Sequence, residues 1–96
     1  MATAREAVER HAKATVEWKL DVAAGDLVPE LAATIQPLVE QLAKLQLTGH
    51  EIISETKEGD KVVFKVKYIG KEGSLLVQSK WSLIDGVWKA VEGTVV

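Results

Sequence analysis

Residues 48–96 read TGHEIISETKEGDKVVFKVKYIGKEGSLLVQSKWSLIDGVWKAVEGTVV and decide the fold. Three short turn sequences divide this stretch, at Lys57-Glu58-Gly59, at Gly70-Lys71-Glu72-Gly73 and at Asp85-Gly86. Between the turns, β-branched and aromatic residues alternate with polar ones, which is typical of half-buried antiparallel strands. The stretch therefore predicts four strands that follow one another as a meander.

The turns also predict which residues share a face of the sheet. Asp85-Gly86 is typical of a two-residue type I′ hairpin, which pairs Ile84 with Val87. Counting outward from this turn pairs Trp81 with Ala90, Ser79 with Glu92 and Val77 with Thr94. The residues of these last three pairs share one face. A four-residue loop at 70–73 places Val62, Phe64, Val66 and Tyr68 on that face. A three-residue loop with Gly59 in the left-handed position places His50, Ile52, Ser54 and Thr56 there as well. The first strand stays open at this point, because a slip of one residue would bring in Ile53 instead.

We call this the inner face, because it holds the aromatic residues of the sheet and is expected to lie under the helices. The outer face holds five lysines, a pattern that discourages aggregation at a sheet surface. It also holds the aliphatic residues Val63, Leu76, Ile84, Val87, Val91 and Val95. Exposed aliphatic residues in this number indicate a partner, and a two-fold homodimer through the outer face is the simplest one.

The residues before Thr48 predict helices. From about Thr3 to Ala24, buried-type residues recur at alternating spacings of four and three, which predicts one long helix. Gly25 fits the C-cap of this helix, and Asp26 fits the N-cap of the next. The second helical segment, at 27–47, contains Pro37 and is expected to kink or break near Gln36.

The predicted fold class is therefore α+β. A long N-terminal helix and a broken second helix pack on one face of a curved, four-stranded antiparallel meander. The chain is expected to be a single domain over 1–96, helical over 1–47 and sheet over 48–96.

Composition excludes several classes of protein. The 96 residues include no cysteine, so no disulfide is available. Twelve basic and 14 acidic residues give a net charge of −2 and no basic cluster, so no nucleic-acid partner is expected. No apolar run is long enough for a signal sequence or a membrane span, and we expect no membrane association and a cytoplasmic location.

The order of elements resembles the nuclear transport factor two-like superfamily of cystatin-like α+β folds. The residues that carry the resemblance are AAGD at 23–26, LTGHEIISETKEGDKVVFKVKY at 47–68 and WSLIDGVWKAV at 81–91. The last is similar to the "vDGkWk" hairpin of small members whose function is unassigned. The resemblance implies a conical pocket between the long helix and the concave sheet, and a dimer through the outer face. Some members are isomerases, dehydratases, cyclases or epoxide hydrolases, and many only bind ligands or proteins; this short chain lacks the extra hairpin and the long closing helix of the larger enzymes.

The candidate site residues lie on the predicted inner face and on the first helix. The ligand-binding candidates are Trp18, His50, Tyr68, Ser79, Trp81 and Glu92. The catalytic candidates are Glu92, His11 and His50, because a buried carboxylate or a histidine can move protons near neutral pH. Each has a plain structural interpretation too: a solvated carboxylate at the rim, two hydrogen-bonded histidines, and tryptophans that fill the core. No cofactor is expected, and the two histidines form no metal motif.

Three functions follow from these observations. The favoured one is a pocket that binds a mostly apolar small molecule without catalysis. The first alternative is a homodimeric protein-interaction module with a filled core. The second is an enzyme of the isomerase, dehydratase or cyclase type, in which Glu92 works with His11 or His50 in acid/base chemistry.

Overall fold

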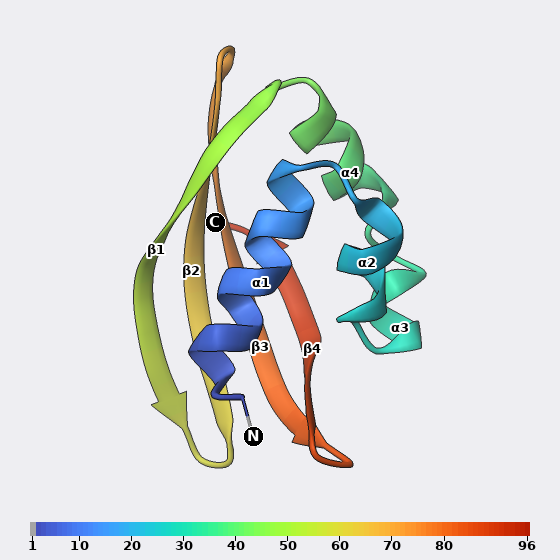
Figure 1. The fold of residues 1–96 in the computed structure, drawn as a ribbon, viewed down its shortest axis with the longest axis vertical. Helices are drawn as coiled ribbons and strands as arrows, with labels where there is room; N and C mark the ends of the chain where they lie inside the picture. The colour runs from blue at the N-terminus through green and yellow to red at the C-terminus, as the bar shows by residue number, and fades with distance from the viewer. Residues whose placement is uncertain (1) are drawn as a thin grey trace.

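The computed structural model describes residues 2–96 and has the α+β fold that the sequence predicts (Figure 1). All helices lie on one face of an antiparallel sheet whose strand order is β1-β2-β3-β4 (Figure 1). The helices are α1 (Ala4–Val16), α2 (Leu20–Gly25), α3 (Pro29–Ala32) and α4 (Gln36–Ala43). The strands are β1 (Leu47–Glu58), β2 (Lys61–Gly70), β3 (Gly73–Ile84) and β4 (Val87–Val95).

The first helix begins at a capping box and packs closely on the sheet. The Thr3 side chain accepts a hydrogen bond from the backbone of Glu6, whose carboxylate in turn accepts from the Thr3 backbone. The buried face of α1 is built mainly of small residues, which allows the helix to approach the strands closely. The largest fully buried side chains are Trp81, Phe64 and Val8. The core therefore lies between α1 and the inner face of β2 and β3.

The single long helix predicted for residues 3–24 is wrong, because the chain breaks at Trp18. This residue has a φ of 59°, in the left-handed region. The Lys19 amide donates to the Ala14 carbonyl at 2.8 Å and the Trp18 amide to the Thr15 carbonyl at 3.0 Å. These two bonds form a Schellman motif, the usual end of a helix. As a result α2 turns away from α1 instead of continuing it.

The corner at Gly25 and Asp26 also differs from the prediction. Gly25 is the last residue of α2 and Asp26 is its C-cap, while the N-cap of α3 is Val28. Asp26 and Val28 instead bond to β4: the Ala90 amide donates to the Asp26 carbonyl at 2.8 Å, and the Val28 amide donates to the Ala90 carbonyl at 3.0 Å. The corner is thus attached to the edge of the sheet.

The break expected in the second helical segment is confirmed. The segment divides into α3 and α4, and Pro37 lies in the first turn of α4. Backbone amides in a first turn have no acceptor within the helix, so a proline there costs no hydrogen bond. The helix ends at Ala43, and β1 already begins at Leu47.

The centre of the sheet follows the predicted pairing. Trp81 pairs with Ala90 and Ile84 with Val87, and Asp85 and Gly86 both have positive φ, as a type I′ turn requires. The turn between β1 and β2 is shorter than predicted. Glu58 pairs with Lys61, which leaves only Gly59 and Asp60 in the loop.

Extra residues in the two edge strands shift the predicted pairing. In β4, Trp81 pairs with Ala90 but Lys80 pairs with Glu92, which leaves Val91 without a partner. In β1, Ile53 is skipped in the same way. Each such bulge moves the following residues to the opposite face and bends the strand. The predicted pairs Ser79–Glu92 and Val77–Thr94 are therefore wrong: Glu92 and Thr94 belong to the outer face and Val95 to the inner face, while Ser54 and Thr56 move to the outer face.

Candidate functional site

A hollow of about 290 Å³ lies between the helices and the inner face of β2, β3 and β4. Its walls are mostly apolar, and all four helices contribute to them. The apolar lining residues on α2, on α3 and α4 and in the segments between them are Leu20, Ala23, Ala24, Leu27, Leu31, Ala32, Ile35, Leu38, Val39 and Leu42. The break at Trp18 makes this hollow possible, because it turns α2 to the side of α1.

The polar groups of the hollow come from α1 and the sheet. His11 and Thr15 line it from α1, and Tyr68, Ser79 and Trp81 line it from the strands. The Trp81 Nε1–H donates to Ser79 Oγ at 2.9 Å, and the Thr15 hydroxyl donates to the His11 carbonyl at 2.9 Å. Burial raises the pKa of Tyr68 to about 12, and the Thr15 side chain offsets part of that rise. Tyr68 therefore stays a neutral hydroxyl that can donate to a ligand oxygen.

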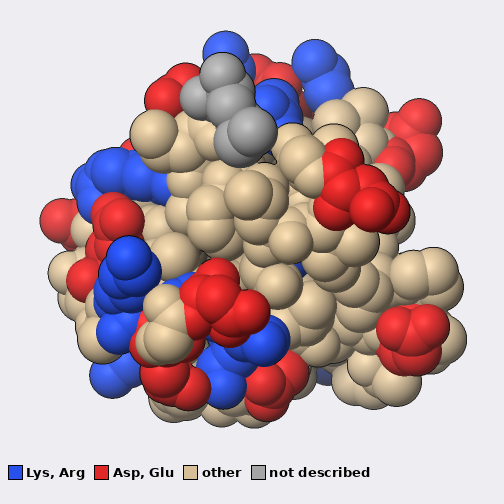
Figure 2. All heavy atoms as spheres, turned by 90° about the horizontal axis from the view of Figure 1, so that it is seen from below, with Lys and Arg blue, Asp and Glu red and all other residues tan. Residues whose placement is uncertain are grey.

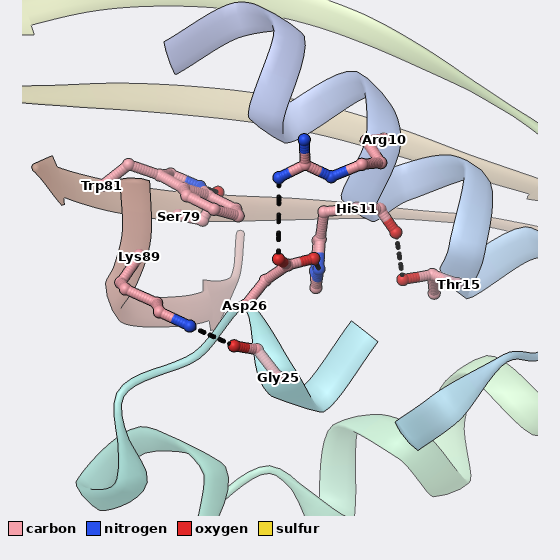
Figure 3. A network of polar contacts seen from close by, with 8 residues as sticks. All are labelled: Arg10, His11, Thr15, Gly25, Asp26, Ser79, Trp81 and Lys89. Atoms are coloured by element: carbon pink, nitrogen blue, oxygen red, sulfur yellow. Dashed lines mark hydrogen bonds and ion pairs between the residues drawn. The ribbon is translucent and has the colours of Figure 1, made fainter. Parts of the chain in front are cut away.

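A histidine–aspartate pair lies beside these polar groups (Figure 3). His11 Nδ1 lies 3.1 Å from Asp26 Oδ2, and both side chains are largely buried, with 18% and 14% exposed. Arg10 approaches the other carboxylate oxygen of Asp26 at 4.0 Å. The His11 ring meets Trp81 edge to face, with 5.4 Å between ring centroids. Since a carboxylate only accepts, Nδ1 carries the hydrogen and Nε2 of a neutral His11 keeps a free lone pair.

Asp26 is the site residue that the sequence reasoning assigned to another role. It was expected to cap a helix, whereas its carboxylate orients His11. The available signal was a lone acid in the apolar stretch VAAGDLVP at 22–29. Helix-cap statistics explain such an acid equally well, so only the fold reveals the contact.

The structure does not bring the predicted catalytic residues together. Glu92 borders the hollow at β4, but its side chain is 68% exposed and its carboxylate lies 3.2 Å from Lys80 Nζ on the outer face. His50 does not line the hollow; its Nε2 lies 3.2 Å from Glu9 Oε2, between β1 and α1. Of the ligand-binding candidates, Trp18, Tyr68, Ser79 and Trp81 line the hollow with Glu92 at its rim, and His50 does not.

The predicted dimer interface is divided by the bulges. Val63 and Leu76 lie half-buried on the outer face, while Ile84 and Val87 are exposed beside the last turn. Val91 is the unpaired bulge residue, and Val95 pairs with the inner residue Val77. The centre of the outer face is polar, because Lys80 bonds both Glu58 at 3.0 Å and Glu92 at 3.2 Å. These hydrogen bonds with Glu58 and Glu92 raise the pKa of Lys80.

Charges of both signs are mixed at one end of the molecule. Figure 2 looks at the end where α1 begins, and basic and acidic residues are interspersed there on the side of β1 and β2. Uncharged atoms occupy the centre of this end. Within residues 2–96 no three metal-ligating side chains come together, and no helix is long and apolar enough to cross a membrane.

Comparison with known proteins gives a likeness of fold alone. No protein-family model matches this chain, and no curated protein matches it in sequence. Among solved structures, the fold is similar to a crystal structure described as a "known function protein" from Kribbella flavida DSM 17836, with a TM-score of 0.62 and 11% sequence identity. The match covers 95% of this chain and 83% of that one. At this identity, the two proteins share an architecture over nearly the whole chain.

Proposed function

We propose that this chain is a binding domain for a small, mostly apolar molecule, held in the hollow between the helices and the inner face. The observation that carries the proposal is the 290 Å³ hollow itself, with its apolar walls and a small set of polar groups on one side. This composition and size are close to those of known ligand pockets, which run from about 300 to 1,000 Å³. Protein cores are otherwise packed nearly without voids, so the hollow weighs against the alternative of a filled core.

The test is a thermal-shift screen against a panel of metabolites and apolar compounds, with two matched variants. Ala32 lines the hollow, and its neighbour Ala33 is exposed and does not. Ala32→Trp should fill the hollow and abolish the stabilisation by any hit, while Ala33→Trp should leave it intact. A ligand at a hundredfold excess over its Kd stabilises the native state by about 2.7 kcal/mol, which a thermal shift detects easily. Hits that survive Ala32→Trp would place binding elsewhere and refute the proposal.

A second function, acid/base catalysis in the same hollow, is favoured by the His11–Asp26 pair. Its geometry leaves His11 Nε2 as a base, oriented by a carboxylate, in a site that also holds the Tyr68 hydroxyl. These residues replace Glu92 and His50 as the catalytic candidates. The test is to incubate each hit with the wild type and with His11→Gln and to search for product. Turnover that His11→Gln abolishes supports an enzyme, and ligands that the wild type returns unchanged support binding alone.

We also infer that the chain is a small member of the nuclear transport factor two-like superfamily, which its element order and its pocket support.

The homodimer has weaker support, because Lys80 and its two acidic partners occupy the centre of the outer face. Sedimentation tests it directly: a dimer that Leu76→Lys dissociates agrees with the predicted interface, and a monomeric wild type refutes it. The cytoplasmic location stays a prediction.

A further inference from the structure

A second hollow, of about 350 Å³, also has Trp18 in its lining. Trp18 and Leu42 line both hollows, so the two hollows adjoin at these residues. The second hollow is the more polar, because Gln46, Thr48 and Lys71 contribute to its lining. Lys71 is the only lysine or arginine that borders either hollow within the described part of the chain.

We propose that the two hollows form one binding site for an anionic amphiphile of the medium-chain carboxylate class. The apolar tail lies in the first hollow, and the carboxylate lies beside Lys71 in the second. This inference rests on the proposed function, because it assigns a ligand class to the same pocket.

The distribution of charge sets the direction in which such a ligand binds. The Asp26 carboxylate, 3.1 Å from the lining residue His11, places a negative charge beside the first hollow, and no lysine or arginine lines that hollow within residues 2–96. The exposed carboxylate of Glu92 stands at the rim of the same hollow. Lys71, by contrast, makes no ion pair within residues 2–96, so its charge is available to a ligand. The tail therefore points inward and the head outward.

Trp18 supplies the apolar surface that joins the two parts. Trp18 is 42% exposed, although it is the larger of the two residues that line both hollows. Its backbone holds a φ of 59°, which a glycine would adopt without strain. Strained residues gather at binding sites, and here the strain places an indole where a ligand chain must pass from one hollow to the other. Taken together, the two volumes fall well inside the range of known ligand pockets.

The experiment is isothermal titration of two probes that share a chain length and differ in charge. Decanoate, used below its micellar concentration, carries the anionic head, and 1-decanol carries a neutral one. Each is titrated into the wild type, Lys71→Gln and the control Lys65→Gln, which removes one charge from the outer face, where Lys65 pairs with Gln78. We expect Lys71→Gln to weaken decanoate binding about three- to tenfold and to leave 1-decanol unchanged, because a partly exposed charge pair contributes modestly. Lys65→Gln should change neither, and added salt should weaken decanoate alone.

The outcomes separate this inference from the proposed function. If both probes bind the wild type equally and Lys71→Gln changes neither, the amphiphile is refuted while the apolar pocket stands. If Lys65→Gln weakens decanoate as much as Lys71→Gln does, the effect is one of net charge and the assignment to Lys71 falls. If neither probe binds, the amphiphile is refuted, and the panel screen with Ala32→Trp then decides separately whether the pocket binds anything.

Discussion

At the scale of one residue, Trp18 combines a strained backbone conformation with an exposed indole, and the two can be tested separately. It occupies the position after the C-cap in a Schellman motif, where glycine is the usual residue. A side chain there costs about 1–2 kcal/mol, because Cβ approaches the following carbonyl. The sequence offers no glycine or proline at this point, so periodicity alone predicts a continuous helix.

The first prediction compares two truncations of Trp18. Trp18→Gly and Trp18→Ala both remove the indole, but only the glycine relieves the left-handed backbone. We expect Trp18→Gly to be about 1 kcal/mol more stable than Trp18→Ala in urea unfolding, and both to bind decanoate or 1-decanol much more weakly than the wild type. Equal stability of the two variants would show that the backbone at residue 18 relaxes, and unchanged binding would remove Trp18 from the site.

Tyr68 gives a prediction for alkaline pH. Burial raises its pKa in the folded state to about 12, from an ordinary value of 10.0. The neutral hydroxyl is thus favoured by folding. Its contribution to the free energy of unfolding is complete below pH 10 and is lost as the pH rises from 10 through 12. A rise of this size in the pKa of Tyr68 corresponds to at most about 3 kcal/mol of stability.

The measurement is simple because Tyr68 is the only tyrosine in the chain. Absorbance titration near 295 nm therefore follows this single phenol, and its midpoint should lie well above 10. Tyr68→Phe should make stability less sensitive to pH between 10 and 12, while the lysines affect both proteins alike. A midpoint near 10 in the folded protein would contradict the burial of the hydroxyl.

The β4 strand shows at the scale of an element why the candidate site was only partly predictable. Turn sequences define pairing near each turn, so the partner of Trp81 and the face that Phe64 occupies are predicted correctly. A bulge carries no comparable signal, since Val91 fits a regular strand as well as a bulge. Beyond Val91 each residue changes face, and the predicted buried acid Glu92 becomes an exposed partner of Lys80.

Deletion of Val91 tests this account of β4. Val91 is the extra residue, so its deletion should make the pairing regular and leave Glu92 opposite Lys80 on the outer face. Glu92→Val should then change the unfolding free energy by less than about 1 kcal/mol in the full-length chain and in the deletion background alike, because Glu92 is exposed in both. A loss of several kcal/mol on deletion that Glu92→Val recovers would mean that the deletion buries the carboxylate, and would contradict the bulge at Val91.

The whole molecule combines a continuous sheet with a discontinuous helical wall. Hydrogen bonds join the four long strands into one ladder, and α1 packs on it with much of the core. The helices α2, α3 and α4 have six, four and eight residues, and of these residues only Ala23 and Leu42 are buried. Binary patterning predicts such a division into sheet and helices. It does not predict a cavity, because the same apolar residues on α3 and α4 would also suit a filled core.

This uneven construction predicts where the protein opens and what a ligand stabilises. Residues 20–46 have few buried contacts, so their amides should exchange with solvent faster than those of the sheet. A ligand in the first hollow contacts all three of these short helices, so saturation with 1-decanol should slow exchange in residues 20–46 and leave residues 49–58 of β1, which line neither hollow, unchanged. Mass spectrometry of exchange resolves the two regions, and Ala32→Trp, with the hollow already filled, should show slow exchange without ligand and no further change with it. Slowing that is confined to the outer face of the sheet would place the ligand on the opposite side of the molecule from the four helices.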